Sequence, residues 1–157
     1  MKPDYDPRVL ETSGDDVTID DNSMYWRGDY LFDGVLGEER SDGGFEFLSF
    51  KDGVRDGPTG EIDEDGDLVF EEWYRKGHLH GISRVFRDDG TLLRATGNEF
   101  GVAIWTVDFE PDGETARPAS VKQLSESSRR VVQRYRSRYP QLPPVLGPEH
   151  AGDITEH

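Results

Sequence analysis

The stretch Gly53-Val-Arg-Asp-Gly57 begins a pattern that recurs downstream as Gly77-His-Leu-His-Gly81 and Gly97-Asn-Glu-Phe-Gly101. In each copy two glycines enclose three other residues. Asp-Gly pairs lie between and after the copies, at Asp65-Gly66, Asp89-Gly90 and Asp112-Gly113. The glycines of these pairs are 24 and 23 residues apart, and a regular interval of this length is typical of repeat architectures. The segment 53–113 therefore predicts tandem copies of one small unit.

Short runs of β-branched and aromatic residues fill the intervals between the glycines. Examples are Leu68-Val-Phe-Glu-Glu-Trp-Tyr-Arg75 and Val102-Ala-Ile-Trp-Thr-Val-Asp-Phe109. Runs of this composition favour strands, and the glycines leave too little length for helices. An Asp-Gly pair supplies the positive backbone angles of a two-residue hairpin turn. Each unit is therefore predicted to be a β-hairpin, and the array an antiparallel meander.

The residues from about 50 to 113 resemble the variant MORN-type repeat. The resemblance rests on Asp65-Gly66-Asp-Leu68, Glu72-Trp-Tyr74, Gly77 to Gly81 and Asp89-Gly90-Thr-Leu92. Bacterial proteins built of this repeat include antitoxin and immunity proteins of the YwqK type. The resemblance implies a mainly β fold of hairpin repeats and a function in neutralising a toxin. The third copy departs from the pattern, because Ala95-Thr96 stand where an aromatic residue is expected.

The composition suits one domain with a thin core. Of the 157 residues 33% are hydrophobic and 32% are charged, so we expect a sheet with one face covered rather than a large closed core. The chain contains no cysteine, which excludes disulfides and thiol chemistry. No stretch approaches the roughly 20 apolar residues of a membrane span, and the first residues lack a secretory signal. We therefore expect a cytoplasmic protein without a membrane partner.

The negative charge is concentrated in the first three quarters of the chain. The net charge is −15 overall, and residues 1–117 alone, with 12 basic and 29 acidic residues, carry −17. A field of this sign repels nucleic-acid phosphates and attracts basic proteins. Solubility alone is the simpler explanation of such an acidic surface.

Four segments follow from these patterns. We expect a flexible acidic arm over 1–22, the hairpin-repeat domain over 23–117, an amphipathic helix over 118–139 and a loose tail over 140–157. The helix prediction rests on an apolar stripe at three- and four-residue steps. The stripe consists of Val121, Leu124, Val131, Tyr135 and Tyr139. We expect this helix to lie across the sheet, with its arginines meeting acidic strands.

Motifs that could carry chemistry are weak in this sequence. His78 and His80 are separated by one residue, but zinc needs three or four converging ligands and no third is near. The run Asp63-Glu-Asp65-Gly-Asp67 begins like a calcium loop, yet its glycine is at the fourth position and Tyr74 occupies the twelfth. No nucleophile motif or phosphate-binding loop occurs. We predict a protein that is not an enzyme and has no metal and no cofactor.

The arginine-rich segment after residue 118 could bind RNA or DNA. The acidic domain before it opposes that interpretation, and a helix with charged flanks is usually only solvated. We therefore expect no nucleic-acid partner.

Three functions are weighed against the sequence. The first is an antitoxin or immunity protein that covers a basic toxin, such as a nuclease or deaminase, whose substrate is a polyanion. The second is a non-enzymatic MORN-like repeat scaffold for another protein partner; an enzyme with an unrecognised carboxylate site is a third. The partner-binding candidates are acidic turn and strand residues with one aromatic anchor. They are Glu64, Asp65, Asp67, Glu71, Glu72, Trp73, Asp88 and Asp89.

Overall fold

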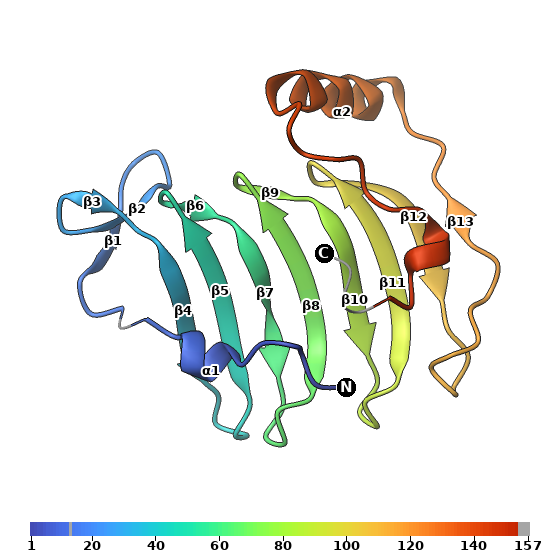
Figure 1. Cartoon of the computed structure of the whole chain (residues 1–157), viewed down its shortest axis with the longest axis horizontal. Coiled ribbons are helices and arrows are strands. Elements are labelled where there is room, and N and C mark those ends of the chain that lie inside the picture. Colours follow the sequence, from blue (N-terminus) through green and yellow to red (C-terminus); the bar gives the residue numbers. More distant parts are fainter. Residues whose placement is uncertain (13, 154–157) are drawn as a thin grey trace.

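Antiparallel hairpins dominate the computed structural model, which describes residues 1–12 and 14–153 (Figure 1). A small sheet holds β1 (Val17–Ile19), β2 (Tyr25–Arg27) and β3 (Tyr30–Leu31). The main sheet begins with β4 (Gly34–Glu39), β5 (Phe45–Lys51), β6 (Val54–Arg55), β7 (Gly57–Ile62) and β8 (Leu68–Arg75). It continues with β9 (His78–Leu79), β10 (Gly81–Phe86), β11 (Leu92–Glu99), β12 (Val102–Asp108) and β13 (Ser120–Val121). The helices are α1 (Pro7–Leu10), α2 (Glu126–Arg138) and the 3-10 helix η1 (Pro148–His150).

The strands of the main sheet follow the chain order, with β4 at one edge and β13 at the other. The predicted fold class, a mainly β antiparallel meander with one long C-terminal helix, is confirmed. The strand β7 was not among the predicted strands, because two glycines and a proline in Gly57-Pro-Thr-Gly60 weaken a strand pattern. Gly60 lies between Phe47 and Glu71 on the neighbouring strands, and a β-carbon there would come within 2.3 Å of the Phe70 carbonyl oxygen.

Two kinds of turn stand at opposite ends of the main sheet. At one end, called here the Asp-Gly end, the tips are 40–44, 63–67, 87–91 and 110–115. Only the glycine of each tip has a positive φ, between 72° and 87°. The two-residue turn predicted from the Asp-Gly pairs is therefore wrong, and each tip is a longer loop closed by an aspartate side chain.

The opposite end, called here the helix end, has the two-residue turns. They are Asp52-Gly53, Lys76-Gly77 and Phe100-Gly101, and both residues of each pair have a positive φ. Their glycines are spaced 24 residues apart. The sequence pattern aligned Gly97 with Gly77, but Gly97 is a strand residue of β11 that makes room for the Trp105 ring. The repeat is therefore more regular than the predicted alignment, and Gly101 is the equivalent of Gly77.

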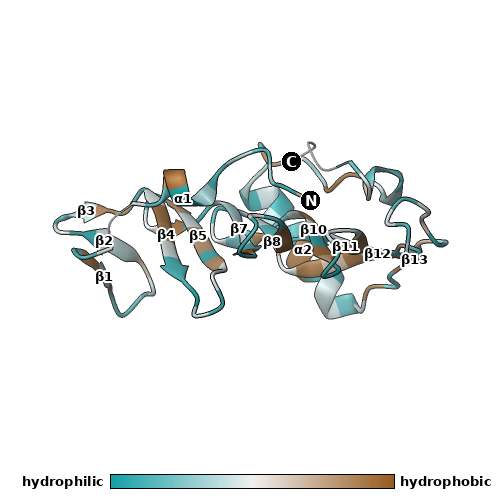
Figure 2. Cartoon of the chain, turned by 90° about the horizontal axis from the view of Figure 1, so that it is seen from below, coloured by the Kyte–Doolittle hydropathy of each residue, from teal (hydrophilic) through white to brown (hydrophobic). Residues whose placement is uncertain are grey.

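One face of the main sheet carries the core, and both ends of the described chain cover it (Figure 2). Tyr5 packs edge-on against Phe47 and Trp73, and Ala151 is 2% exposed within the same cluster. We expected a flexible arm and a loose tail, but the described parts of both segments make specific contacts with the sheet. Residues 13 and 154–157, which those predictions include, lie outside the described residues.

The helix α2 is shorter than predicted and lies elsewhere. It begins at Glu126 because the Ser125 hydroxyl accepts a hydrogen bond from the Ser128 amide, while Ser120 and Val121 pair with β12. Its buried residue is Val132. Tyr135 contacts His78 and Phe100 at the turns, so α2 packs at the helix end instead of across the face (Figure 1).

Candidate protein-binding surface

The eight candidate residues divide into three groups by position. Five acids lie on two tips of the Asp-Gly end: Glu64, Asp65, Asp67, Asp88 and Asp89. The tips are close together because β7, β8, β10 and β11 are successive strands of the sheet. Glu72 lies on the face opposite the core. Glu71 and Trp73 lie on the covered face, where Glu71 is 1% exposed.

Some acids of the Asp-Gly end are needed to form the turns. The Asp63 carboxylate accepts hydrogen bonds from the amides of Asp65 and Asp67, at 2.9 and 2.8 Å. In the other tips the acceptor is the aspartate directly before the glycine, at Asp42, Asp89 and Asp112. In every tip an aspartate therefore satisfies amides that the loop leaves unpaired, but in the tip 63–67 it is the first residue of the tip instead.

Other acids at the same tips have no such role. The side chains of Glu64, Asp65 and Asp88 are exposed and have no hydrogen-bond or ion-pair partner among the described residues. They add negative charge that the fold itself does not require. This surplus distinguishes Glu64, Asp65 and Asp88 from the acids that close the turns.

The aspartates that close the turns have lowered pKa values. Hydrogen bonds from the Thr91 hydroxyl and amide lower the pKa of Asp89, and bonds from Thr115 lower the pKa of Asp112. The Gly44 amide lowers the pKa of Asp42. Donors directed at a carboxylate favour its ionised form. The tips therefore remain charged at pH values where a free carboxyl begins to protonate.

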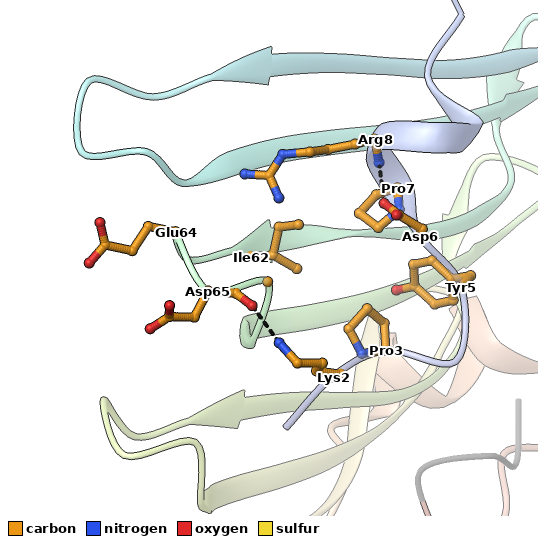
Figure 3. Close-up of a pocket in the computed structure, with 10 residues that line it drawn as sticks. Lys2, Pro3, Tyr5, Asp6, Pro7, Arg8, Ile62, Glu64 and Asp65 are labelled. Carbon is orange, nitrogen blue, oxygen red and sulfur yellow. Dashed lines mark hydrogen bonds between the residues drawn. The ribbon is translucent and has the colours of Figure 1, made fainter.

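The N-terminal segment neutralises part of this charge. Asp67 pairs with the amino group of Met1 at 2.9 Å and has a lowered pKa for that reason. A cleft of about 320 Å³ lies between this segment and the tip 63–67 (Figure 3). Its walls carry both signs of charge, from Lys2, Asp6 and Arg8 and from Glu64 and Asp65.

A second cleft, of about 360 Å³, joins neighbouring tips. The carboxylates that line it come from Asp42, Glu61, Asp63, Glu64 and Asp88. Arg40 lies within 3.6 Å of the Asp42 and Glu61 carboxylates. One guanidinium against five carboxylates leaves the cleft strongly negative.

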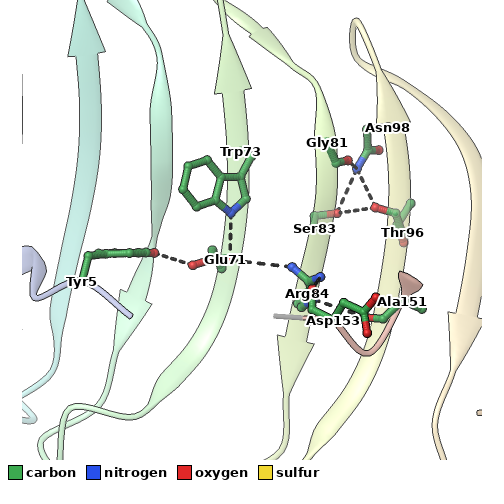
Figure 4. Close-up of polar contacts among 10 residues, drawn as sticks. All are labelled: Tyr5, Glu71, Trp73, Gly81, Ser83, Arg84, Thr96, Asn98, Ala151 and Asp153. Carbon is green, nitrogen blue, oxygen red and sulfur yellow. Dashed lines mark hydrogen bonds and ion pairs between the residues drawn. The ribbon is translucent and has the colours of Figure 1, made fainter. Parts of the chain in front are cut away.

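The buried pair beneath the terminal segments has a structural role. Glu71 accepts hydrogen bonds from the Tyr5 hydroxyl and the Trp73 indole (Figure 4). Arg84, 1% exposed, approaches Glu71 to 3.9 Å and donates to the backbone carbonyls of Ala151 and Asp153. Burial and the Glu71 charge raise the pKa of Tyr5, and burial lowers that of Arg84. Glu71 is therefore buried, away from a partner's reach, whereas Trp73 is half-buried on the same face.

The other face of the main sheet is open, since no described element packs over its centre. Phe70 and Val85 are cross-strand neighbours there, and Glu61 pairs with Phe70. Val69, Val85 and Leu93 are 36–41% exposed. The sequence pattern did not predict this apolar strip, because Val69 is the extra residue of a β-bulge in β8 and strict alternation would place it on the face of Glu71.

The two histidines have packing roles. His78 contacts the rings of Phe100, Tyr135 and Tyr139. The pKa of His78 is lowered mainly by its burial and also by the nearby positive charge of Arg138. The Nε2 atom of His80 is 2.7 Å from the Pro143 carbonyl oxygen. Within the described residues, no three histidine, aspartate or glutamate side chains are grouped to hold a metal ion. In that same part of the chain, no helix has the length and apolar character to cross a bilayer.

Comparison with known proteins adds no assignment. No protein-family model matches the chain, and no curated protein matches it.

Proposed function

We propose that this chain is a non-enzymatic antitoxin or immunity-type protein that binds a basic protein toxin and covers its active site. The observation that carries the proposal is the surplus of exposed carboxylates on adjacent tips of the Asp-Gly end. The side chains of Glu64, Asp65 and Asp88 have no ion-pair partner among the described residues and are not needed for their turns. Lysines and arginines of a partner would supply the missing charge.

A toxin that acts on nucleic acid fits this surface best. The active site of such an enzyme attracts phosphates, and carboxylates on neighbouring hairpin tips present a comparable row of negative charge. Opposite fields of this kind speed association by 10 to 1,000-fold, roughly, and fix the orientation of the encounter. The resemblance of residues 50–113 to MORN-type antitoxin-group proteins supports the same class of partner.

The open face favours a second candidate, a repeat scaffold for a different protein. Val69, Val85 and Leu93 form an exposed apolar strip, and such strips bordered by polar residues are typical of protein interfaces. A scaffold of this kind would bind through the strip, and charge at the tips would matter little.

Co-expression with the polypeptide encoded by the adjacent reading frame tests the proposal. We expect a one-to-one complex that restores growth and whose association rate falls as salt rises. The double variant Glu64→Lys/Asp88→Lys should slow association by more than about 10-fold, because it reverses charge on two adjacent tips. The matched control is Asp15→Lys/Asp16→Lys, which changes the net charge equally at exposed positions next to β1.

If both double variants slowed association with the partner equally, the Asp-Gly end would not be part of the interface. Loss of binding on Val85→Lys, with no effect of the tip variant, would favour the scaffold. A neighbouring polypeptide that neither binds nor harms growth contradicts the antitoxin proposal.

A further inference from the structure

The exposed side of α2 carries a row of arginines. Arg130, Arg134 and Arg138 are spaced by four residues, so they follow one stripe of the helix with steps of about 6 Å. All three side chains are exposed. Glu126, which pairs with Arg130, is the only acidic residue of the helix.

The opposite side of α2 fixes the helix in place. Val132 is buried, and the Tyr135 ring stacks on Phe100 at 5.5 Å. Arg136 forms a bidentate contact with the carboxylate of Glu99, which is 2% exposed. The arginine stripe therefore lies on the side of α2 away from Val132, and its last residue, Arg138, lies over the Tyr139 ring at 5.5 Å.

Distance separates this stripe from the acidic tips. The strand β8 connects the two ends and has eight residues, which corresponds to about 26 Å. The Debye length at physiological ionic strength is about 8 Å. Because the separation is about three Debye lengths, the charge of the Asp-Gly end is largely screened at α2. Our expectation that the chain has no nucleic-acid partner rested on its net negative charge. That net charge does not describe the exposed surface of α2.

We propose that the exposed stripe of α2 binds the phosphate backbone of duplex DNA. The three arginines place successive positive charges along one side of the helix, and guanidinium groups bind phosphate oxygens with paired hydrogen bonds. A protruding helix fits the major groove of B-form DNA, about 12 Å wide, whereas the major groove of duplex RNA is too narrow.

Two features define the kind of contact. Tyr135 of α2 and Tyr139, which follows the helix, both pack against Phe100, so they are not placed to stack on the bases of a single strand. Guanidinium groups and the exposed Gln133 can also contact base edges. The proposal concerns the contacts of the arginines with phosphates, which position a protein on DNA without reading its sequence.

Fluorescence anisotropy with a labelled 20-base-pair DNA duplex tests the proposal. The slope of log affinity against log salt should be about −2.7 for three phosphates. The variant Arg130→Gln/Arg134→Gln/Arg138→Gln should lose at least about tenfold in affinity at 50 mM salt, and its slope should approach zero. The matched control, Arg94→Gln/Arg117→Gln, removes arginines paired with Asp108 and Glu110 near the Asp-Gly end and should bind like the parent chain. Circular dichroism confirms that each variant is folded.

Three further probes decide between ligands: the single-stranded DNA of the same sequence, a duplex RNA and a polyglutamate peptide. The proposal holds if duplex DNA binds most tightly and the binding depends on the three arginines. It is overturned if no binding occurs at 50 mM salt, or if the triple variant binds like the parent chain. Tighter binding of single strands, duplex RNA or polyglutamate also overturns it, the last in favour of an acidic protein.

Discussion

The two ends of the main sheet both connect neighbouring antiparallel strands, but they do so with different kinds of turn. The Asp-Gly end closes its hairpins with aspartate side chains that accept backbone amides, so part of its negative charge is built into the fold. The helix end uses two-residue turns with positive φ at both positions, and these accept Asp52, Lys76 or Phe100 next to the glycine. The comparison teaches how to separate charge that a turn requires from charge that it does not. Glu64, Asp65 and Asp88 belong to the second class.

The largest expected effect lies between the two ends, at the buried pair Glu71 and Arg84. The variant Arg84→Met leaves Glu71 buried beside no cation, and we expect it to lose about 3–5 kcal/mol of unfolding free energy. The double variant Glu71→Leu/Arg84→Met removes both charges and should recover part of that loss, because the Tyr5 hydroxyl and the Trp73 indole lose their acceptor. Urea denaturation measures both. Equal loss in the single and the double variant would mean that the pair does not act as a unit.

A smaller effect is expected at the helix end from Gly101→Ala. Gly101 has a φ of +81°, and a β-carbon there meets no atom within 4 Å. The cost is therefore one of backbone conformation alone, about 1–2 kcal/mol. Gly152→Ala is the matched control, because that position is equally open and has no positive φ; it should change stability by less than about 0.5 kcal/mol. Thermal unfolding compares the two, and similar losses would contradict the assignment of the turn type.

At the Asp-Gly end, neighbouring acids should behave differently. Asp63→Ala removes an acceptor of two amide hydrogen bonds and should cost about 1 kcal/mol. Glu64→Ala should change stability by less than about 0.5 kcal/mol, since its side chain has no partner among the described residues. If Glu64→Ala were the more destabilising variant, Glu64 would be a structural residue and the proposed binding role would lose its basis.

The smallest effect concerns pH. The pKa values of Asp42, Asp89 and Asp112 are lowered in the folded chain. Their contribution to stability is therefore present above the unfolded pKa, about 3.9, and is lost as pH falls through the lower folded values. The melting temperature of Asp89→Ala should decline less steeply than that of the parent chain below about pH 4. If the melting temperatures of Asp89→Ala and of the parent chain fell equally steeply with pH, Asp89 would not contribute to the loss of stability in acid.

Local patterns in the sequence predicted the strands well and the covering of the sheet poorly. The glycine spacing and the runs around Trp73 and Trp105 predicted antiparallel hairpins, because turn chemistry and β-propensity act over a few residues. Tyr5 and Ala151 could not be recognised as core residues, because each packs as a single side chain, outside any periodic pattern, against strands that are far away in the sequence. The heptad-like stripe from Val121 predicted too long a helix, because pairing of Ser120 and Val121 with β12 competes with the helical pattern.

The candidate site was predictable only in part. The acids at 64, 65, 88 and 89 were recognised from the Asp-Gly tips, and the meander brings them together. Glu71 and Glu72 looked alike in sequence, yet strand alternation buries the first and leaves the second on the open face. Alternation shows which residues share a face of the sheet but not which face is covered. The terminal segments cover one face, and that face is the buried one.

Near-surface electrostatic potentials, measured by NMR with cationic and anionic nitroxide cosolutes, test the central claim most directly. The account predicts negative potentials at residues 63–67, 87–91 and 110–115 and positive potentials along 129–138 at physiological salt. Variant Glu64→Lys/Asp88→Lys should change the first set and leave the helix unchanged. A uniformly negative potential over both ends would contradict the separation of charge on which both proposed surfaces depend.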